Sequence, residues 1–172
     1  MNCADIVDDY IQRYRNAARK EMDDFKNERS LSAAIRRAAL CELRNGKRHP
    51  HQRRIPKEVL ERVGVRLQAI EQRLAKATNF AIIHKLVGNE IGNLYGIGPL
   101  TVYDVAHRIG AYLEKAPERV YLHAGTKIGA RVLGIKGDSF DPGSLPKSLS
   151  LLSPAEIEDC LCIYKDELEG AQ

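Results

Sequence analysis

A glycine-containing turn at residues 94–101 has the residue types that can bind a phosphate group. The sequence there reads LYGIGPLT, and segments with helical apolar spacing lie on both sides of it. Glycine can adopt positive backbone φ angles and lets another backbone approach closely, and Pro99 suits the first position of a helix. The free N–H groups of Gly98, Leu100 and Thr101, aided by the helix dipole, would then form a site for one phosphate.

A basic segment at residues 44–54 is a second feature that can attract a polyanion. It holds five Lys or Arg, two His and no carboxylate. Residues 1–76 contain 18 Lys and Arg against 11 Asp and Glu, a formal charge of +7, whereas residues 77–172 contain 9 against 12, a charge of −3. Such a run creates a local positive potential. The alternative interpretation is a solvated loop between two helices.

Three polar residues further along the chain are spaced for one face of a helix. His123, Lys127 and Arg131 follow one another at four-residue steps. On a helix that spacing forms a polar stripe beginning at the N-terminus. The stripe is either a second phosphate contact or a solvated helix face.

The remaining histidines and cysteines do not suggest a metal or redox centre. His49 and His51 flank a proline without a carboxylate or cysteine nearby in the sequence, so we expect no metal there. Cys160 and Cys162 would point to different faces of a helix, which favours core packing over redox chemistry. The four cysteines are too few and too irregularly placed for a disulfide framework or a zinc site.

The elements that must position these residues are all predicted to be helices. Apolar residues recur at three- and four-residue steps in most of the chain, and no segment alternates long enough to indicate a sheet. The fold class is therefore all-α. Glycine, serine, aspartate and proline accumulate in a loop at residues 134–153. The expected helices span residues 5–25, 31–45, 56–74, 80–92, about 99–113 and 154–168.

Length and composition fit one helical domain. The chain has 172 residues, of which 44% are apolar and 29% charged, which is a globular composition. No stretch approaches the ~20 apolar residues of a membrane helix. The first residues do not resemble a signal peptide, so we expect a cytoplasmic protein with no membrane partner. Within the single domain we distinguish basic N-terminal helices (1–78), a helical core (79–134) and a loop with a C-terminal helix (135–172).

Residues 80–134 resemble the helix-hairpin-helix DNA glycosylases of the endonuclease III type. In that family the hairpin reads Leu-Pro-Gly-(Ile/Val)-Gly before the second helix, and Tyr95 stands here at the proline. The family's later Asp-x-His matches residues 121–123. The resemblance implies a compact glycosylase-like fold and a place in DNA repair. It also implies a monovalent cation at hairpin carbonyls, here those of Leu94 and Gly96, and no other cofactor.

The resemblance implies duplex DNA as the partner, with no base specificity from the hairpin, because phosphate contacts position a protein without reading sequence. We expect Ile97 to point back into the domain and fix the turn. The expected phosphate-binding residues are Gly96, Ile97, Gly98, Leu100 and Thr101 in the turn, Lys127 and Arg131 after it, and Lys47, Arg48, Arg53 and Arg54 in the basic segment.

Two departures from the family argue against its catalysis. Leu100 stands where strand-cleaving members carry a nucleophilic lysine, and Tyr121 stands at the family's aspartate. Base excision needs an anion or activated nucleophile near the sugar, and an ordinary tyrosine is neutral at pH 7. We therefore expect a non-catalytic DNA-binding protein. Two alternatives stay open: a base-excision enzyme with a rearranged site, for which Glu118, Tyr121 and His123 are candidates, and a protein-interaction module on the same fold.

Overall fold

The computed structural model describes residues 2–145 and 147–169 and is mostly helical within them, which confirms the predicted fold class at that level. Contacts divide the chain into two compact units. We call Lys20–Ala116 the central unit, and Met1–Arg19 together with Pro117–Gln172 the terminal unit. These boundaries do not coincide with the expected segment boundaries near residues 78 and 134. Among the described helices, none combines the length and apolar character needed to span a bilayer.

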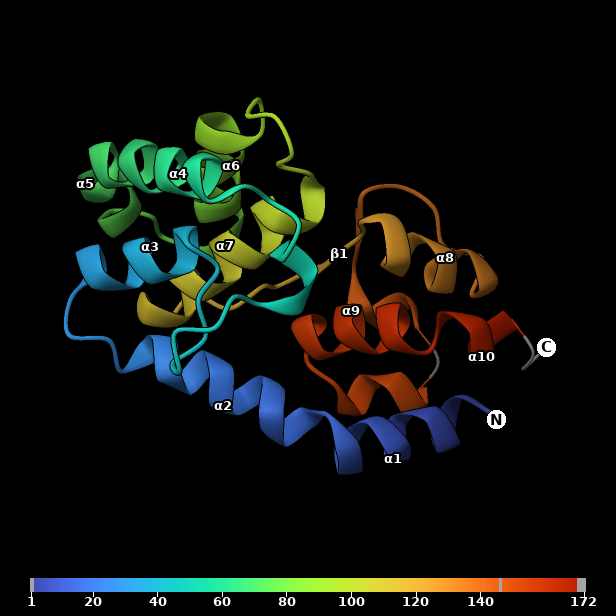
Figure 1. Cartoon of the computed structure of the whole chain (residues 1–172). Helices are drawn as coiled ribbons and strands as arrows, with labels where there is room; N and C mark the ends of the chain where they lie inside the picture. The colour runs from blue at the N-terminus through green and yellow to red at the C-terminus, as the bar shows by residue number, and fades with distance from the viewer. Residues whose placement is uncertain (1, 146, 170–172) are drawn as a thin grey trace. The chain divides into compact units, whose positions relative to one another are not determined.

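The central unit is a layered set of helices around α7 (Figure 1). In it α7 packs on α6 and α3, and α4 packs on both α3 and α6. The side chains with no exposed surface in this core include Phe25, Ile35, Leu60, Leu67, Ile83 and Ile109. Its elements are α2 (Arg15–Lys26, from Lys20 onward), α3 (Leu31–Ala39), η1 (Pro50–Gln52), α4 (Lys57–Ala69), α5 (Glu71–Ala75), α6 (Phe80–Ile91) and α7 (Pro99–Tyr112).

The terminal unit combines helices from both ends of the chain with one small sheet. The antiparallel strands pair Val120 with Phe140 and Tyr121 with Ser139. α8 packs closely on α9, and a Cβ placed on Gly129 would lie 2.4 Å from the carbonyl oxygen of Leu161, so this contact requires glycine. The elements are α1 (Cys3–Arg13), β1 (Val120–Tyr121), α8 (Ala124–Val132), β2 (Ser139–Phe140), η2 (Pro142–Ser144), η3 (Lys147–Leu151), α9 (Pro154–Ile163) and α10 (Lys165–Glu169).

The helices on either side of the glycine turn agree with the sequence prediction. α6 covers residues 80–91 and α7 begins at Pro99, as expected. α9 begins at the predicted capping box, in which the Ser153 hydroxyl accepts from the Glu156 N–H and the Glu156 carboxylate accepts from the Ser153 N–H. In each case a local capping or proline signal marks the boundary.

Three predicted helices are shorter or interrupted. The segment expected at 5–25 breaks at Tyr14, and the one at 56–74 breaks at Ile70. The helix expected at 31–45 ends at Ala39 because Cys41 is buried with a left-handed φ of 52°. Beyond it the chain folds back: the Leu43 N–H donates to the Lys47 carbonyl, and the His49 N–H to the Cys41 carbonyl. This fold-back returns the basic segment to the helices of the central unit.

Candidate nucleic-acid interface

The two glycines of the turn between α6 and α7 have different backbone conformations. Gly96 has a φ of +82°, which favours glycine. Gly98 has an ordinary φ of −100° and caps α7, with Pro99 at its first position. Ile97 is only 8% exposed, which confirms that it points into its unit. The Ile97 N–H donates to the Leu94 carbonyl at 3.1 Å, so one expected cation ligand already accepts a turn hydrogen bond.

The N-terminus of α7 is uncapped and sterically open. No side chain accepts a hydrogen bond at this cap within the described residues, so the amides of Leu100 and Thr101 at the second and third helical positions lack the usual capping partner. A Cβ placed on Gly98 would meet no described atom within 4 Å. Neither backbone angle nor internal packing therefore requires glycine there. Its absent side chain leaves space in front of the first turn of α7.

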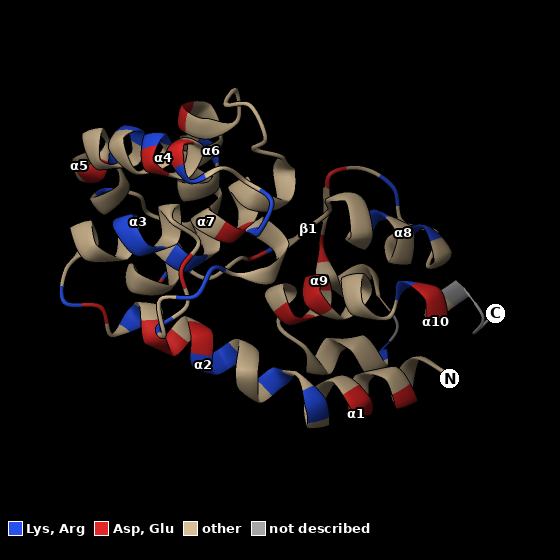
Figure 2. Ribbon diagram, viewed as in Figure 1, with Lys and Arg blue, Asp and Glu red and all other residues tan. Residues whose placement is uncertain are grey.

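The basic segment is attached to α7 within the same unit. Gln52 is fully buried, and its amide Nε2 donates to the Asp104 carboxylate Oδ2 at 2.6 Å. Asp104 lies on the second turn of α7, five residues after Pro99. Figure 2 shows the Lys and Arg residues of the segment that joins α3 to α4. The hydrogen bond thus joins this segment to the helix that starts at the glycine turn.

The cations of this segment are not equally free. Arg48 is half-buried and donates to the Ile55 carbonyl at 2.6 Å, while Arg44 pairs with Asp24. Lys47, Arg53 and Arg54 are exposed, and none forms an ion pair with a described residue. These three cations are the ones available to an external anion.

A buried charge network lies behind the basic segment. Arg108 is 3% exposed and its Nε lies 3.0 Å from the Glu21 carboxylate, which is also 3.6 Å from His49 Nε2. Burial alone would raise the pKa of Glu21, but the His49 hydrogen bond and the Arg108 charge outweigh it and lower the pKa to about 2. Burial lowers the pKa of His107 to about 4. At neutral pH the network therefore contains an ionised Glu21 and a neutral His107.

The polar stripe expected at His123, Lys127 and Arg131 is only partly formed. His123 is 4% exposed, its Nε2 lies 3.2 Å from the Glu158 carboxylate, and the same carboxylate accepts from the Thr126 hydroxyl at 2.7 Å. His123 therefore belongs to a buried cluster instead of a solvent-facing stripe. Glu158 lies 35 residues away on α9, and no local sequence signal links it to His123.

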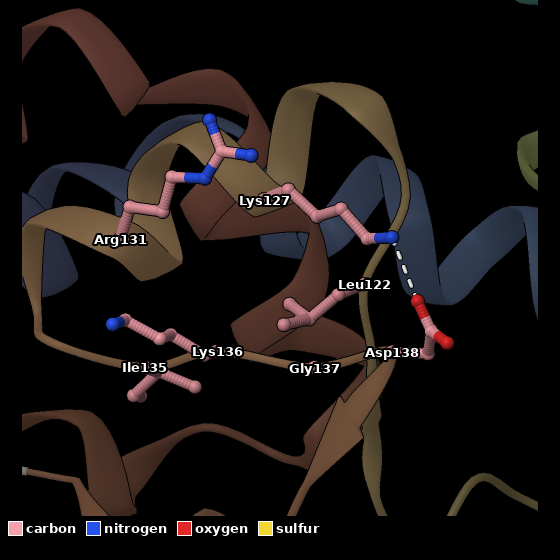
Figure 3. Close-up of a pocket in the computed structure, with 7 residues that line it drawn as sticks. All are labelled: Leu122, Lys127, Arg131, Ile135, Lys136, Gly137 and Asp138. Carbon is pink, nitrogen blue, oxygen red and sulfur yellow. Dashed lines mark hydrogen bonds and ion pairs between the residues drawn. The ribbon is translucent and has the colours of Figure 1, made fainter.

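Lys127 and Arg131 lie together in a pocket of about 440 Å³ in the terminal unit (Figure 3). Lys127 Nζ forms an ion pair with Asp138 at 2.7 Å, so its charge is already matched. Lys136, which is not among the expected phosphate-binding residues, also lines this pocket. The pocket residues are Leu122, Lys127, Arg131, Ile135, Lys136, Gly137 and Asp138.

The candidate catalytic residues all belong to the terminal unit, whereas the glycine turn belongs to the central unit. Glu118 is exposed, and Tyr121 is half-buried at the end of β1. Burial raises the pKa of Tyr121 despite the opposing charge of Arg119. Its phenol is therefore neutral at pH 7 and does not reproduce the negative charge of the family's aspartate.

No protein-family model matches the chain, and neither a characterised protein nor a solved structure is significantly similar to it. The resemblance of residues 80–134 to the endonuclease III type of glycosylase therefore stays a prediction based on their motifs. The geometry and charge of the chain itself are the basis for inferring a function.

Proposed function

We propose that the central unit binds duplex DNA through its phosphate backbone, without base specificity and without catalysis on the bases. The observation that carries this proposal is the open, uncapped start of α7 within a unit of high positive charge. Residues 20–116 contain 18 Lys and Arg against 11 Asp and Glu, a formal charge of +7. An uncapped helix N-terminus offers main-chain donors and a positive dipole end to an anion.

The glycine turn would contact one phosphate directly. The Leu100 and Thr101 amides are the donors, and the empty space at Gly98 lets a phosphate oxygen reach hydrogen-bond distance. Gly96 sets the direction of the turn through its positive φ. Because every nucleotide carries the same phosphate group, this contact would position the DNA without reading its sequence.

The basic segment would contact phosphates beside that one. Lys47, Arg53 and Arg54 are exposed and have no ion-pair partner among the described residues. The Gln52–Asp104 hydrogen bond links their segment to α7. Each phosphate that a cation neutralises releases counterions from the duplex, so the cations would supply much of the affinity.

The absence of catalysis rests on the residues at the family's two reactive positions. Leu100 has no nucleophilic atom, and Tyr121 is a neutral phenol whose pKa is raised by burial. Without a carboxylate near the sugar, several kcal/mol of transition-state stabilisation would be missing. Lesion-bearing duplexes incubated with the chain should therefore release no base above background, and borohydride should trap no covalent adduct.

The binding test is an electrophoretic mobility shift on a duplex at several salt concentrations, with Gly98→Ala as the diagnostic variant. Three or four phosphate contacts predict a slope of log K against log salt of about −3. Gly98→Ala should weaken binding by about 5- to 10-fold, the equivalent of roughly one main-chain hydrogen bond, without loss of folding stability because its Cβ faces open space.

The matched control is Gly64→Ala on α4, where a Cβ would make an ordinary 3.7 Å contact with Ala39. It should leave DNA binding unchanged. Equal affinities of wild type and Gly98→Ala would remove the turn from the interface. No shift even at the lowest salt would reject DNA binding and favour the protein-interaction alternative, for which Tyr95, 90% exposed in the turn, is the first residue to substitute.

A further inference from the structure

We propose that His49, His51 and Asp104 bind one divalent first-row transition metal ion, with Zn²⁺ the best fit. One donor atom from each of these side chains lies within 4.8 Å of the other two. The two histidines alone predicted no metal because no carboxylate is near them in the sequence. The fold supplies that carboxylate from α7, 53 residues after His51.

The surroundings of His49 prepare one ring nitrogen for a metal. His49 Nε2 lies 3.6 Å from the Glu21 carboxylate, and Nδ1 is buried with no hydrogen-bond partner among the described residues. A metal-binding histidine usually donates its second N–H to a carboxylate, which fixes the tautomer. With the proton on Nε2, the lone pair of Nδ1 is available as a ligand.

Asp104 is oriented in the same way. Gln52 is fully buried and donates from Nε2 to Asp104 Oδ2 at 2.6 Å, which holds the carboxylate in place and leaves acceptor capacity for an ion. The Gln52 Oε1 atom is also buried without a partner among the described residues. Native proteins leave few buried polar atoms unsatisfied. A water bound to the ion would supply a donor for this oxygen, which the chain itself does not provide.

The donor set selects the class of metal. Two imidazoles and one carboxylate suit zinc and its transition-metal neighbours, whereas Mg²⁺ and Ca²⁺ prefer sites built entirely of oxygen. Three protein ligands leave a fourth position for water. His51 is exposed, which provides an entry path. The bound ion would fasten the segment at residues 49–52 to α7, and this inference does not depend on DNA binding.

The test is a Zn²⁺ titration of the full chain, stripped beforehand with a chelator, in competition with a chromophoric chelator. We expect one equivalent to bind. Loss of an outer-shell partner of a metal ligand weakens metal affinity by about 10- to 100-fold, and loss of the ligand itself weakens it more. His51→Ala and Asp104→Asn should therefore each weaken Zn²⁺ binding by at least ~100-fold. The amide oxygen introduced by Asp104→Asn can still accept the hydrogen bond from Gln52. Far-UV circular dichroism verifies that each variant is folded. His84→Gln on α6, outside the cluster, is the matched control and should bind as the wild type does.

Co²⁺ substitution gives an independent readout, because ligand-field absorption reports on coordination by nitrogen and oxygen. The spectrum of a bound ion should appear with the wild type and be lost in Asp104→Asn. Absence of Zn²⁺ binding to the wild type at 100-fold molar excess would overturn the proposal. Undiminished binding in both His51→Ala and Asp104→Asn would also overturn it, because the ion would then lie elsewhere in the chain.

Discussion

The two units give their half-buried carboxylates partly different partners. In the central unit, Glu21 is paired with the Arg108 guanidinium and lies near His49. In the terminal unit, the Tyr10 hydroxyl donates to Asp159 at 3.0 Å and the Tyr164 hydroxyl to Asp9 at 2.5 Å. The terminal unit also holds a buried carboxylate by charge, because Glu156 is paired with the guanidinium groups of Arg15 and Arg19. Both units therefore balance a carboxylate with charge, and the terminal unit adds neutral phenols as partners of Asp9 and Asp159.

This difference parallels the charge of each unit. The terminal unit contains 9 Lys and Arg against 12 Asp and Glu, a formal charge of −3, compared with +7 in the central unit. In the central unit Glu21 is compensated internally by Arg108, while Lys47, Arg53 and Arg54 have no ion-pair partner among the described residues. The exposed cations of the central unit, and not Arg108, are therefore the ones that the proposed anionic ligand would meet.

The largest effect should come from breaking the buried pair in the central unit. Arg108→Leu leaves Glu21 without its cation, and removal of one partner of a buried pair costs about 3–5 kcal/mol. Tyr10→Phe in the terminal unit removes one hydrogen bond to a half-buried carboxylate and should cost about 1 kcal/mol. Urea unfolding followed by circular dichroism measures both.

The double variant Arg108→Leu with Glu21→Gln separates charge from packing. It should recover part of the lost stability, because the buried charge is removed along with its partner. Equal losses of unfolding free energy in Arg108→Leu and Tyr10→Phe would show that the Arg108–Glu21 pair stabilises the fold no more than the Tyr10–Asp159 hydrogen bond does.

A smaller effect should separate the two sets of surface cations in DNA binding. Arg53→Glu with Arg54→Glu should weaken duplex binding by about 10- to 100-fold and flatten the salt dependence, since two phosphate contacts become repulsive. Arg131→Glu with Lys136→Glu, in the pocket of the terminal unit, should change the affinity by less than about 3-fold, the scale of a screened long-range charge effect. Mobility shifts at fixed salt compare them. A comparable loss in both would place the interface on both units and support the predicted roles of Lys127 and Arg131.

The sequence predicted the parts of the fold that depend on local signals. Pro99 and the Ser153 capping box mark helix starts correctly, and the burial of Ile97 follows from its place between two glycines. The breaks at Tyr14 and Ile70 were not predicted, because apolar periodicity continues through both of them. A pattern of burial shows which face is apolar but does not show where the backbone changes direction.

The candidate sites show the same limit. The turn at residues 94–101 is contiguous, so its position between two helices and the helix start at Pro99 could be predicted from the sequence alone. The proximity of His51 to Asp104 and of His123 to Glu158 depends on contacts between distant segments. From the sequence alone, His49 and His51 therefore predicted no metal site, and His123 was expected in a helical stripe.

The last prediction concerns how stability depends on pH at named groups of the two units. In the central unit the pKa of Glu21 is lowered from 4.5 to about 2. The stability that this provides is complete above pH 4.5 and is lost as the pH falls toward 2. The pKa of His107 is lowered from 6.5 to about 4, so the folded state disfavours its protonation and stability is lost as the pH falls from 6.5 toward 4. Both groups make the central unit sensitive to acid.

In the terminal unit the shifts of Tyr10 and Cys160 act at high pH. Each unit also has one shift of the other kind: hydrogen bonds from Ser153 and Arg19 outweigh burial and lower the pKa of Glu156 in the terminal unit, and burial raises the pKa of Cys41 to about 11 in the central unit. Burial and the neighbouring Asp159 raise the pKa of Tyr10 above its ordinary 10.0, and burial raises that of Cys160 from 9.0 to about 12. These groups ionise more easily when unfolded, so the stability they provide is present at neutral pH and is lost as the pH rises above 9 to 10. Within its window each group changes the unfolding free energy by about 1.4 kcal/mol per pH unit. Urea midpoints measured from pH 3 to 11 should therefore fall at both ends. Glu21→Gln should reduce the acid slope alone and Tyr10→Phe the alkaline slope alone; a variant that altered both slopes would show that the two networks are coupled.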